Sequence, residues 1–344
     1  MNQPVRSAVP ILPASAALLA AQGQGGAHLT AFASDASPRR YFRLEGQGLI
    51  LMEDPADPAG FAAYLRLSAH LNGLGLSAPR VIAAAQEQGV ALIEDFRDGT
   101  YSNPLAQGQD ETALYELAVD ALLHLHHDIR AAQVDQPDYD PDVFLNELDL
   151  FTDWFAPAVL PDLKVAAFRS KWRNLWRVTL APLAEHRHTL VLRDFHVDNL
   201  MLLAGRSGIA RCGLLDFQDA LIGPCEYDLV SLLQDARRDL RAGLEDKMLK
   251  RYIASAPEFL GGGDAIRRRY HLLGAQRHAR ILGVFVRLCQ RDAKPRYLQF
   301  LRRVLAQFQT ALTAAKLTEI ETLLDQTLGD WRSVAATLPT RLNP

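Results

Sequence analysis

The sequence predicts an α+β protein with a small N-terminal antiparallel sheet and a larger, mostly helical C-terminal part. Three observations carry this prediction. Short β-favouring runs bounded by turn residues occur within the first hundred residues. Apolar residues recur at helical spacing through most of the chain after about residue 98. One strand–loop–strand segment, Leu190 to Asp219, interrupts that helical part and carries several polar side chains.

The composition limits the classes of protein to consider. With 344 residues the chain is long enough for two lobes, each with its own core. The net charge of −3 argues against binding to nucleic acid or to an anionic membrane surface. No apolar run approaches the ~20 residues that span a membrane. The three cysteines, Cys212, Cys225 and Cys289, have no CxxC spacing and indicate free thiols in a reducing compartment.

The N-terminal elements follow from local signals. Residues 13–22 predict an opening helix ended by Gly23, because prolines interrupt this apolar segment and argue against a signal peptide. A second helix begins with Asp57 as its cap and Pro58 at its first position. The predicted strands are residues 28–33, 40–44, 49–52 and 90–93.

The C-terminal part is predicted from helical stripes. Apolar residues recur at helical spacing in residues 110–129 and 144–155. A further helix begins near Glu226, and the final third of the chain is helical apart from the glycines at 261–263. We therefore place the lobe boundary near the polar link Glu94–Phe96.

The segment Leu190 to Asp219 has the residue types and spacing of a phosphoryl-transfer site. A polar loop with Asp194 and Asn199 follows the first strand, and two short apolar runs joined by a turn deliver Asp216. Phosphoryl transfer needs a carboxylate near the attacking hydroxyl, and an amide and a second carboxylate that hold Mg²⁺. The alternative is that these are ordinary turn residues. The ordered set of three favours a kinase signature.

Five segments carry a resemblance to a known family: Ser34–Arg43, Arg193–Asn199, Asp216–Asp219, Gly223–Asp228 and Gln276–His278. These short segments are spread over most of the chain, from Ser34 to His278. The sequence resembles the aminoglycoside-phosphotransferase-like small-molecule kinases. Within them it is most similar to bacterial kinases that phosphorylate the anomeric hydroxyl of N-acetylmuramate and N-acetylglucosamine in peptidoglycan recycling.

The resemblance implies a bilobal, protein-kinase-like fold. Residues 1–95 would form the nucleotide-binding lobe and residues 96–344 the catalytic and sugar-binding lobe. ATP would be the co-substrate and Mg²⁺ the cofactor. Asp194 would be the base, Arg193 would stabilise its loop, and Asn199 and Asp216 would hold the metal.

The implied nucleotide site departs from the usual pattern in two ways. The loop Ser34–Arg39 stands where kinases place a glycine-rich flap, but it contains no glycine. Met52 stands where the phosphate-binding lysine is usual, and the following helix has no acid to pair with a lysine. An arginine among residues 39–43 could replace that lysine, although each could equally be a solvated side chain. The nucleotide-binding residues we predict are Ser34, Asp35, Ala36, Ser37, Arg43, Met52, Glu94 and Phe96.

The predicted acceptor site draws on several segments. Arg277 could bind an acceptor carboxylate bidentately, which would favour N-acetylmuramate. The acid-rich stretch 131–163 either forms a wall of the acceptor pocket or is a solvated acidic face. Asp228 matches a family aspartate that braces the catalytic loop. The substrate-binding residues we predict are His196, Asp149, Tyr227, Arg277 and His278.

The predicted partners are ATP and a small amino sugar, in the cytoplasm, with no nucleic acid, membrane or protein substrate. A protein substrate is unexpected because no long loop follows Asp216. One alternative is an aminoglycoside, choline or homoserine phosphotransferase. Another is an inactive binding module, which would explain Met52 but not the presence of Asp194, Asn199 and Asp216 together.

Overall fold

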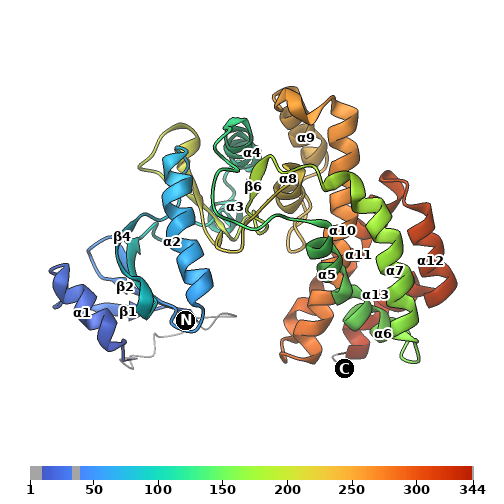
Figure 1. Ribbon diagram of the computed structural model, residues 1–344, viewed down its shortest axis with the longest axis horizontal. Helices are drawn as coiled ribbons and strands as arrows, with labels where there is room; N and C mark the ends of the chain where they lie inside the picture. Colours follow the sequence, from blue (N-terminus) through green and yellow to red (C-terminus); the bar gives the residue numbers. More distant parts are fainter. Residues whose placement is uncertain (1–9, 33–38, 343–344) are drawn as a thin grey trace. The chain divides into compact units, whose positions relative to one another are not determined.

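A computed structural model describes residues 10–32 and 39–342 (Figure 1). The chain divides into two compact units. Unit 1 comprises Met1–Ala121 and Val197–Ala220, and unit 2 comprises Leu122–His196 and Leu221–Pro344. The segment Arg193–Asn199 therefore contributes Asp194 to unit 2 and Asn199 to unit 1. The expected functional division after residue 95 stays a prediction.

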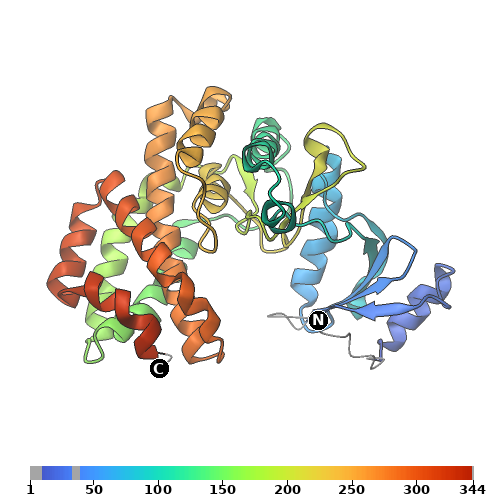
Figure 2. The same ribbon diagram turned by 180° about the vertical axis from the view of Figure 1, so that it is seen from behind.

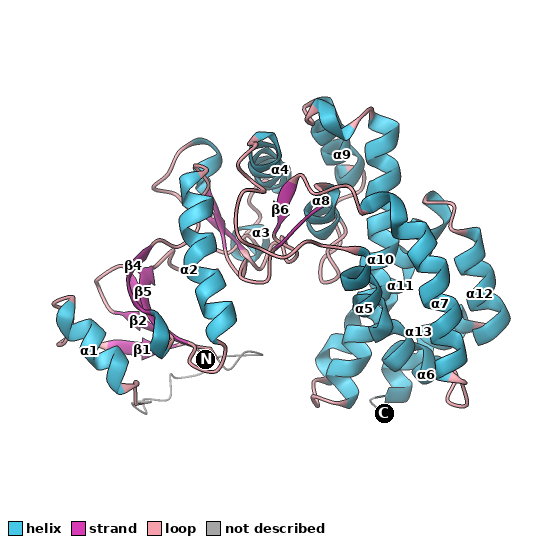
Figure 3. Ribbon diagram, in the orientation of Figure 1, coloured by secondary structure: helices cyan, strands magenta, loops and turns pink. Residues whose placement is uncertain are grey.

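Unit 1 is built on a five-stranded antiparallel sheet with the strand order β1-β2-β3-β5-β4 (Figure 3). The strands are β1 (Leu29–Ala31), β2 (Arg40–Leu44), β3 (Leu49–Glu53), β4 (Val81–Ala85) and β5 (Val90–Glu94). Four of them match the predicted strands. The strand β4 was not predicted, because its sequence Val-Ile-Ala-Ala-Ala has neither polar alternation nor strong β-formers throughout.

The two faces of this sheet have different roles. Side chains alternate between the faces of a strand. One face packs Phe42, Leu44, Leu51, Val90 and Leu92 around Leu19 of helix α1 (Pro13–Ala21). The other face carries Tyr41, Arg43, Ile50 and Ile93, which line a pocket. The alternation thus separates a structural core from a surface that a ligand can reach.

Three helices and a hairpin complete unit 1. Helix α2 (Pro58–Gly73) begins as predicted, with the Asp57 carboxylate accepting a hydrogen bond of 2.9 Å from Gly60 N. Helix α3 is Ser102–Ala106, and α4 (Glu111–His127) runs past the end of the unit at Ala121. Strands β7 (Leu200–Leu202) and β8 (Cys212–Leu214) pair antiparallel, as the sequence predicts.

Unit 2 is mostly helical, with one two-stranded sheet of β6 (Thr189–Val191) and β9 (Leu221–Gly223). Helices α10 and α11 lie side by side in both views (Figures 1 and 2). The helices are α5 (Pro141–Leu150), α6 (Ala156–Val159), α7 (Val165–Leu180), α8 (Glu226–Leu233), α9 (Leu244–Ala254), α10 (Gly263–Gln290), α11 (Leu301–Ala314), α12 (Thr318–Leu328) and α13 (Trp331–Leu342).

Helix α10 is the central element of unit 2. It packs against α5, α8 and α11, and against the π-helical turn η2 (Phe151–Phe155) that continues α5. Phe151 of η2 stacks on Trp172 with ring centroids 4.6 Å apart. Gly283 of α10 faces the backbone at Leu150 so closely that a Cβ there would lie 2.2 Å from the Leu150 carbonyl oxygen. Only glycine permits this approach.

No helix among residues 10–32 and 39–342 is long and apolar enough to cross a membrane.

We expect Gly283→Ala to destabilise the protein by about 2–3 kcal/mol, because the methyl group must push α10 away from the Leu150 backbone. Gly73→Ala is the matched control: Gly73 lies in exposed helix with nothing within 4 Å of its added Cβ, so the change should stabilise by about 0.5–1 kcal/mol. Urea denaturation measures both. Equal stabilities of the two variants would contradict the close packing at Gly283.

Candidate active site

The backbone of the predicted catalytic loop is held by Asp228, the third residue of α8. Its two carboxylate oxygens accept hydrogen bonds from Leu192 N, at 2.6 Å, and Arg193 N, at 2.8 Å. The Ser231 hydroxyl donates to the Arg193 carbonyl oxygen at 3.2 Å. These contacts fix Arg193 in a left-handed conformation, with φ of 70°, that non-glycine residues rarely adopt. Asp228 thus braces the loop, as the sequence predicts.

A buried charge network anchors the Arg193 side chain. Its guanidinium donates to Glu147 Oε1 at 2.5 Å, and Arg280 lies 3.6 Å from the same oxygen. Tyr139 and Gln276 donate to Glu147 Oε2 at 2.6 and 3.0 Å. Burial raises the pKa of Glu147, but Arg280 and Arg193 lower it more, so the carboxylate stays ionised. One carboxylate therefore joins α5, α10 and the catalytic loop.

Asp194 lies in a positive environment within unit 2. Burial raises its pKa, but Arg280, Arg277, His196 and Arg193 outweigh that effect and hold the pKa below its ordinary value. The carboxylate is therefore ionised at neutral pH. That state suits a group that accepts a proton from, or orients, a hydroxyl.

The predicted acceptor residues of unit 2 lie in different surroundings. Arg277 is buried, donates to Ser231 Oγ at 2.6 Å, and places its guanidinium over the Tyr227 ring. His278 is fully buried against Gln234, and burial lowers its pKa to about 3. Asp149 pairs with Arg173 at 2.5 Å. The contacts of these residues are thus intramolecular, and their predicted role in substrate binding stays a prediction.

His196 has a different neighbour. It is buried, and its Nε2 lies 3.5 Å from Nη1 of Arg237 in the loop after α8. Burial and Arg237 lower the pKa of His196, so the imidazole is neutral. Since guanidinium groups only donate, Nε2 is the acceptor nitrogen of this pair.

In unit 1, Asn199 and Asp216 line one pocket of about 510 Å³. They flank the β7–β8 hairpin, and Leu215 N donates to Asn199 O at 2.9 Å, which holds the two ends of the hairpin together. Asp216 has a φ of 57° and accepts from Gln218 Nε2 at 2.8 Å. The pocket residues from the sheet and the link after it are Tyr41, Arg43, Ile50, Ile93, Glu94, Asp95, Phe96, Arg97 and Asp98.

The donor atoms of Asn199 and Asp216 suit Mg²⁺. An amide oxygen and a carboxylate are the hard oxygen ligands that Mg²⁺ takes alongside phosphate oxygens and water. Groups of three or more His, Cys, Asp or Glu side chains able to hold a metal do not occur in the described parts of the chain. A metal here would therefore need ligands from its substrate as well as from Asn199 and Asp216.

The three arginines in β2 and directly before it, Arg39, Arg40 and Arg43, pair with different carboxylates. Arg43 binds Asp95 and Asp98 in the link after β5, and Arg40 binds Glu53. Arg39 donates to the buried Asp54 at 2.7 Å.

Arg39 occupies the region beside Met52. Its guanidinium lies 3.5 Å from the Tyr41 hydroxyl and over the Tyr64 ring, and Tyr41 pairs with Met52 across β2 and β3. Tyr64 stacks on Phe217, next to Asp216, with ring centroids 5.0 Å apart. Met52 itself is completely buried.

The remaining predicted nucleotide-binding residues divide into two groups. Glu94 and Phe96 line the pocket, where Glu94 binds Arg80 and Arg206, and Arg206 also lies over the Phe96 ring. Ser34, Asp35, Ala36 and Ser37 lie outside the described residues.

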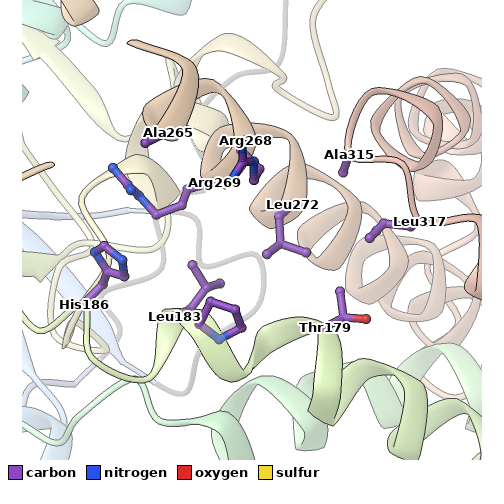
Figure 4. A pocket seen from close by; sticks show the side chains of 10 residues that line it. Thr179, Leu183, His186, Ala265, Arg268, Arg269, Leu272, Ala315 and Leu317 are labelled. Carbon is purple, nitrogen blue, oxygen red and sulfur yellow. The ribbon is translucent and has the colours of Figure 1, made fainter. Parts of the chain in front are cut away.

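A smaller pocket of about 280 Å³ in unit 2 lies among the end of α7, the start of α10 and the link between α11 and α12 (Figure 4). It is lined mainly by apolar residues such as Leu183, Leu272 and Leu317. Arg269 at its edge binds the buried Glu226 at 2.6 Å. Glu226 begins α8, so this pair anchors the helix that carries Asp228.

Comparisons with known proteins identify the family of this chain. The model of the phosphotransferase enzyme family matches residues 28–262. The chain therefore belongs to the phosphotransferase enzyme family.

Individual relatives cover nearly the whole chain. An N-acetylmuramate/N-acetylglucosamine kinase of Caulobacter vibrioides is 35% identical and aligns over 91% of this chain and 95% of its own length. Proteins of the same name from Neisseria meningitidis and Pseudomonas aeruginosa are 34% and 33% identical. Their alignments cover 88% and 89% of this chain, and 91% of each relative.

Solved structures share the fold at low sequence identity. Aminoglycoside phosphotransferase APH(2'')-Ib matches with a TM-score of 0.58 at 18% identity, covering 88% of this chain and 99% of that one. A choline/ethanolamine kinase family protein from Mesorhizobium loti matches with a TM-score of 0.56 at 15% identity, covering 95% and 98%. The predicted kinase-like α+β fold, the family resemblance and the prediction of a phosphotransferase enzyme are thus confirmed.

Sequence reasoning did not single out Glu147, Tyr139 or Arg237 as site residues, and it named Arg280 only as a possible ligand of an acceptor carboxylate, not as a partner of Glu147. A signal for Glu147 was present: it follows Phe144 by three residues, on the apolar stripe of an amphipathic helix. An acid in that position requires a buried partner. The partners Arg193 and Arg280 are distant in sequence, so the pairing itself could not be read from the chain.

We expect Glu147→Gln to destabilise the protein by about 3–5 kcal/mol, because it leaves Arg193 and Arg280 without their shared carboxylate. Asp153→Asn is the matched control, since Asp153 pairs with Arg169 at a partly exposed position and its loss should cost less than about 1 kcal/mol. Thermal and urea denaturation measure both changes. A Glu147→Gln protein as stable as Asp153→Asn would show that the network contributes little.

Proposed function

We propose that this chain is an ATP-dependent kinase that phosphorylates the anomeric hydroxyl of N-acetylmuramate and N-acetylglucosamine in peptidoglycan recycling. The main support is the family membership together with relatives of that name at 31–35% identity. The ordered set Asp194, Asn199 and Asp216 supports phosphoryl transfer as the reaction. We further propose a cytoplasmic location, where ATP is available.

In this proposal Asp194 accepts the proton of the acceptor hydroxyl or orients that hydroxyl. Its ionised state supports the role. Asn199 and Asp216 would hold Mg²⁺, which supplies positive charge against the phosphates. Arg193 keeps the loop in place through Glu147 rather than contacting substrate.

Arg39 is the residue that we propose in place of the missing lysine. All three arginines among residues 39–43 pair with carboxylates, but Arg39 also lies beside Tyr41 and over the ring of Tyr64, which stacks on Phe217 next to Asp216. The pair Arg39–Asp54 would then take the part of the lysine–glutamate pair of other kinases. Burial opposes the charge of Arg39, but Tyr41 and Asp54 raise its pKa above the ordinary value, so the cation is permanent.

A phosphotransferase for aminoglycosides or small alcohols is the second candidate. The acidic stretch 131–163 would suit a polycationic acceptor. However, Asp138, Glu147, Asp149 and Asp153, four of its eight acids, pair with arginines of the same unit. This pairing removes much of the negative field and favours the amino-sugar proposal.

The test of the function is ADP release by the purified protein with ATP, Mg²⁺ and one acceptor at a time. The acceptors are N-acetylmuramate, N-acetylglucosamine, kanamycin and choline. Release with the two amino sugars alone is expected. Release only with kanamycin or choline would overturn the acceptor while keeping the reaction.

We expect Asp194→Asn to lower kcat by about 10²- to 10⁴-fold while ATP still binds, because the amide cannot accept the proton. Asp198→Asn is the control from the same loop: Asp198 is exposed, binds Ser102, and should keep near-wild-type turnover. Steady-state kinetics and calorimetric ATP binding separate the two effects. Near-wild-type kcat in Asp194→Asn would refute the role as base.

We expect Arg39→Met to raise the KM for ATP by about 10- to 100-fold through loss of a charge-assisted phosphate contact, and Arg39→Lys to lose less. Because Arg39→Met also leaves Asp54 buried without its cation, thermal denaturation must accompany the kinetics. An unchanged KM for ATP in both folded variants would exclude Arg39 from nucleotide binding.

A further inference from the structure

Arg237 is a partly exposed arginine beside the predicted catalytic loop, and its side chain has no carboxylate partner in the described part of the chain. In the described part of the chain, the contact of its guanidinium is with His196, at 3.5 Å. The side chain is partly exposed. His196 is two residues from Asp194 and contributes to its electrostatic environment. A solvent-accessible cation therefore lies next to the residue that we propose as the base.

The neighbouring arginines are already engaged. Arg193 and Arg280 share Glu147, and Arg277 is buried against Ser231 and Tyr227. Arg173 binds Asp149. Binding a ligand through any of these would first require breaking a buried or partly buried contact.

The backbone at Arg237 is firmly placed even though its side chain has no carboxylate partner. Asp235 accepts from Arg237 N at 2.9 Å. Arg303 of α11 donates to the Ala236 carbonyl oxygen and binds Asp239 through two nitrogens at 2.5 and 2.6 Å. Arg303 thus holds the loop from outside on both sides of Arg237, at Ala236 and at Asp239, and the guanidinium starts from a defined position.

We propose that Arg237 is a specificity-determining residue that binds the carboxylate of an acidic amino-sugar acceptor. This inference rests on the proposed function and moves the carboxylate site from Arg277, which the sequence suggested, to Arg237. N-acetylmuramate carries its carboxylate on the substituent at C3, two ring carbons from the anomeric hydroxyl. In our proposal the sugar lies with that hydroxyl at Asp194 and with its carboxylate toward Arg237, whose guanidinium supplies a planar pair of donors.

His196 takes part in this arrangement as a neutral spacer. Its Nε2 accepts a hydrogen bond from Nη1 of Arg237, and this contact orients the guanidinium. N-acetylglucosamine has a hydroxyl at C3 and gains no ionic contact from Arg237. The guanidinium therefore adds affinity for the acidic sugar only.

The test compares the ratio of kcat/KM for N-acetylmuramate to kcat/KM for N-acetylglucosamine in the wild type, Arg237→Gln and Arg237→Lys. Loss of a charge-assisted contact should lower this ratio by about 10- to 100-fold in Arg237→Gln. Arg237→Lys should lose less, because it keeps the charge but not the bidentate geometry. The control is Arg268→Gln, an exposed arginine on α10 of the same unit, which should leave the ratio unchanged.

Calorimetric binding of N-acetylmuramate without nucleotide is the second measurement, and the expected result is weaker binding to Arg237→Gln than to the wild type. An unchanged ratio and unchanged affinity would overturn the inference alone. An equal loss of kcat/KM with both sugars would mean that Arg237 acts on a feature that both sugars share, and this result would also overturn the inference. If the wild type binds N-acetylmuramate but phosphorylates neither sugar, the proposed function is refuted. Calorimetry would then still show whether Arg237 contributes to binding of N-acetylmuramate. No binding to the wild type would overturn both.

Discussion

The pairing of the buried Glu147 carboxylate with Arg193 and Arg280 is the interaction on which the surroundings of Asp194 in unit 2 depend. Arg193 and Arg280 both lie close to the same oxygen of Glu147, so without that carboxylate the two guanidinium groups would repel each other. Both would also repel any further cation near Asp194. Glu147 makes their approach favourable, and Tyr139 and Gln276 satisfy its second oxygen. The strained backbone at Arg193 persists because the side chain is held by Glu147 and the amide by Asp228. Loop geometry is thus set by carboxylates on two helices.

Much of this architecture was predictable from local sequence. The caps of α2, the hairpin β7–β8 and the ordered residues Asp194, Asn199 and Asp216 each depend on neighbours within about twenty residues. The strand β4 was not predicted because three of its five residues are alanine, a weak β-former. The pairing of β6 with β9 was not predicted because the two strands are distant in sequence. The role of Arg277 could not be judged either. Its helical stripe marked it as a possible ligand, and only its contacts with Ser231 and Tyr227 show that it is enclosed.

Met52 stands where other kinases have a lysine, and its surroundings in unit 1 suit an apolar side chain. A lysine at Met52 would need a carboxylate on α2, and the helix provides the aromatic ring of Tyr64 instead. An apolar side chain fits that fully buried position. In our proposal Arg39, before β2, supplies the cation, with Asp54 after β3 as its partner. The described structure thus offers a second ion pair close to β3 where both halves of the usual pair are missing.

Arginines that pair with carboxylates and arginines that do not have different roles in unit 2: the first stabilise the structure, and the second can bind an anionic ligand. Arg193, Arg280 and Arg269 are partly buried and pair with the buried carboxylates of Glu147 and Glu226, so their contacts are structural. A partly exposed arginine on a fixed backbone keeps its charge hydrated and loses little entropy when an anion replaces the water. Arg237 meets this description beside the catalytic loop. Arg277 also has no carboxylate partner among the described residues, but its side chain is buried and donates to Ser231, whereas the side chain of Arg237 is partly exposed and an anion can reach it.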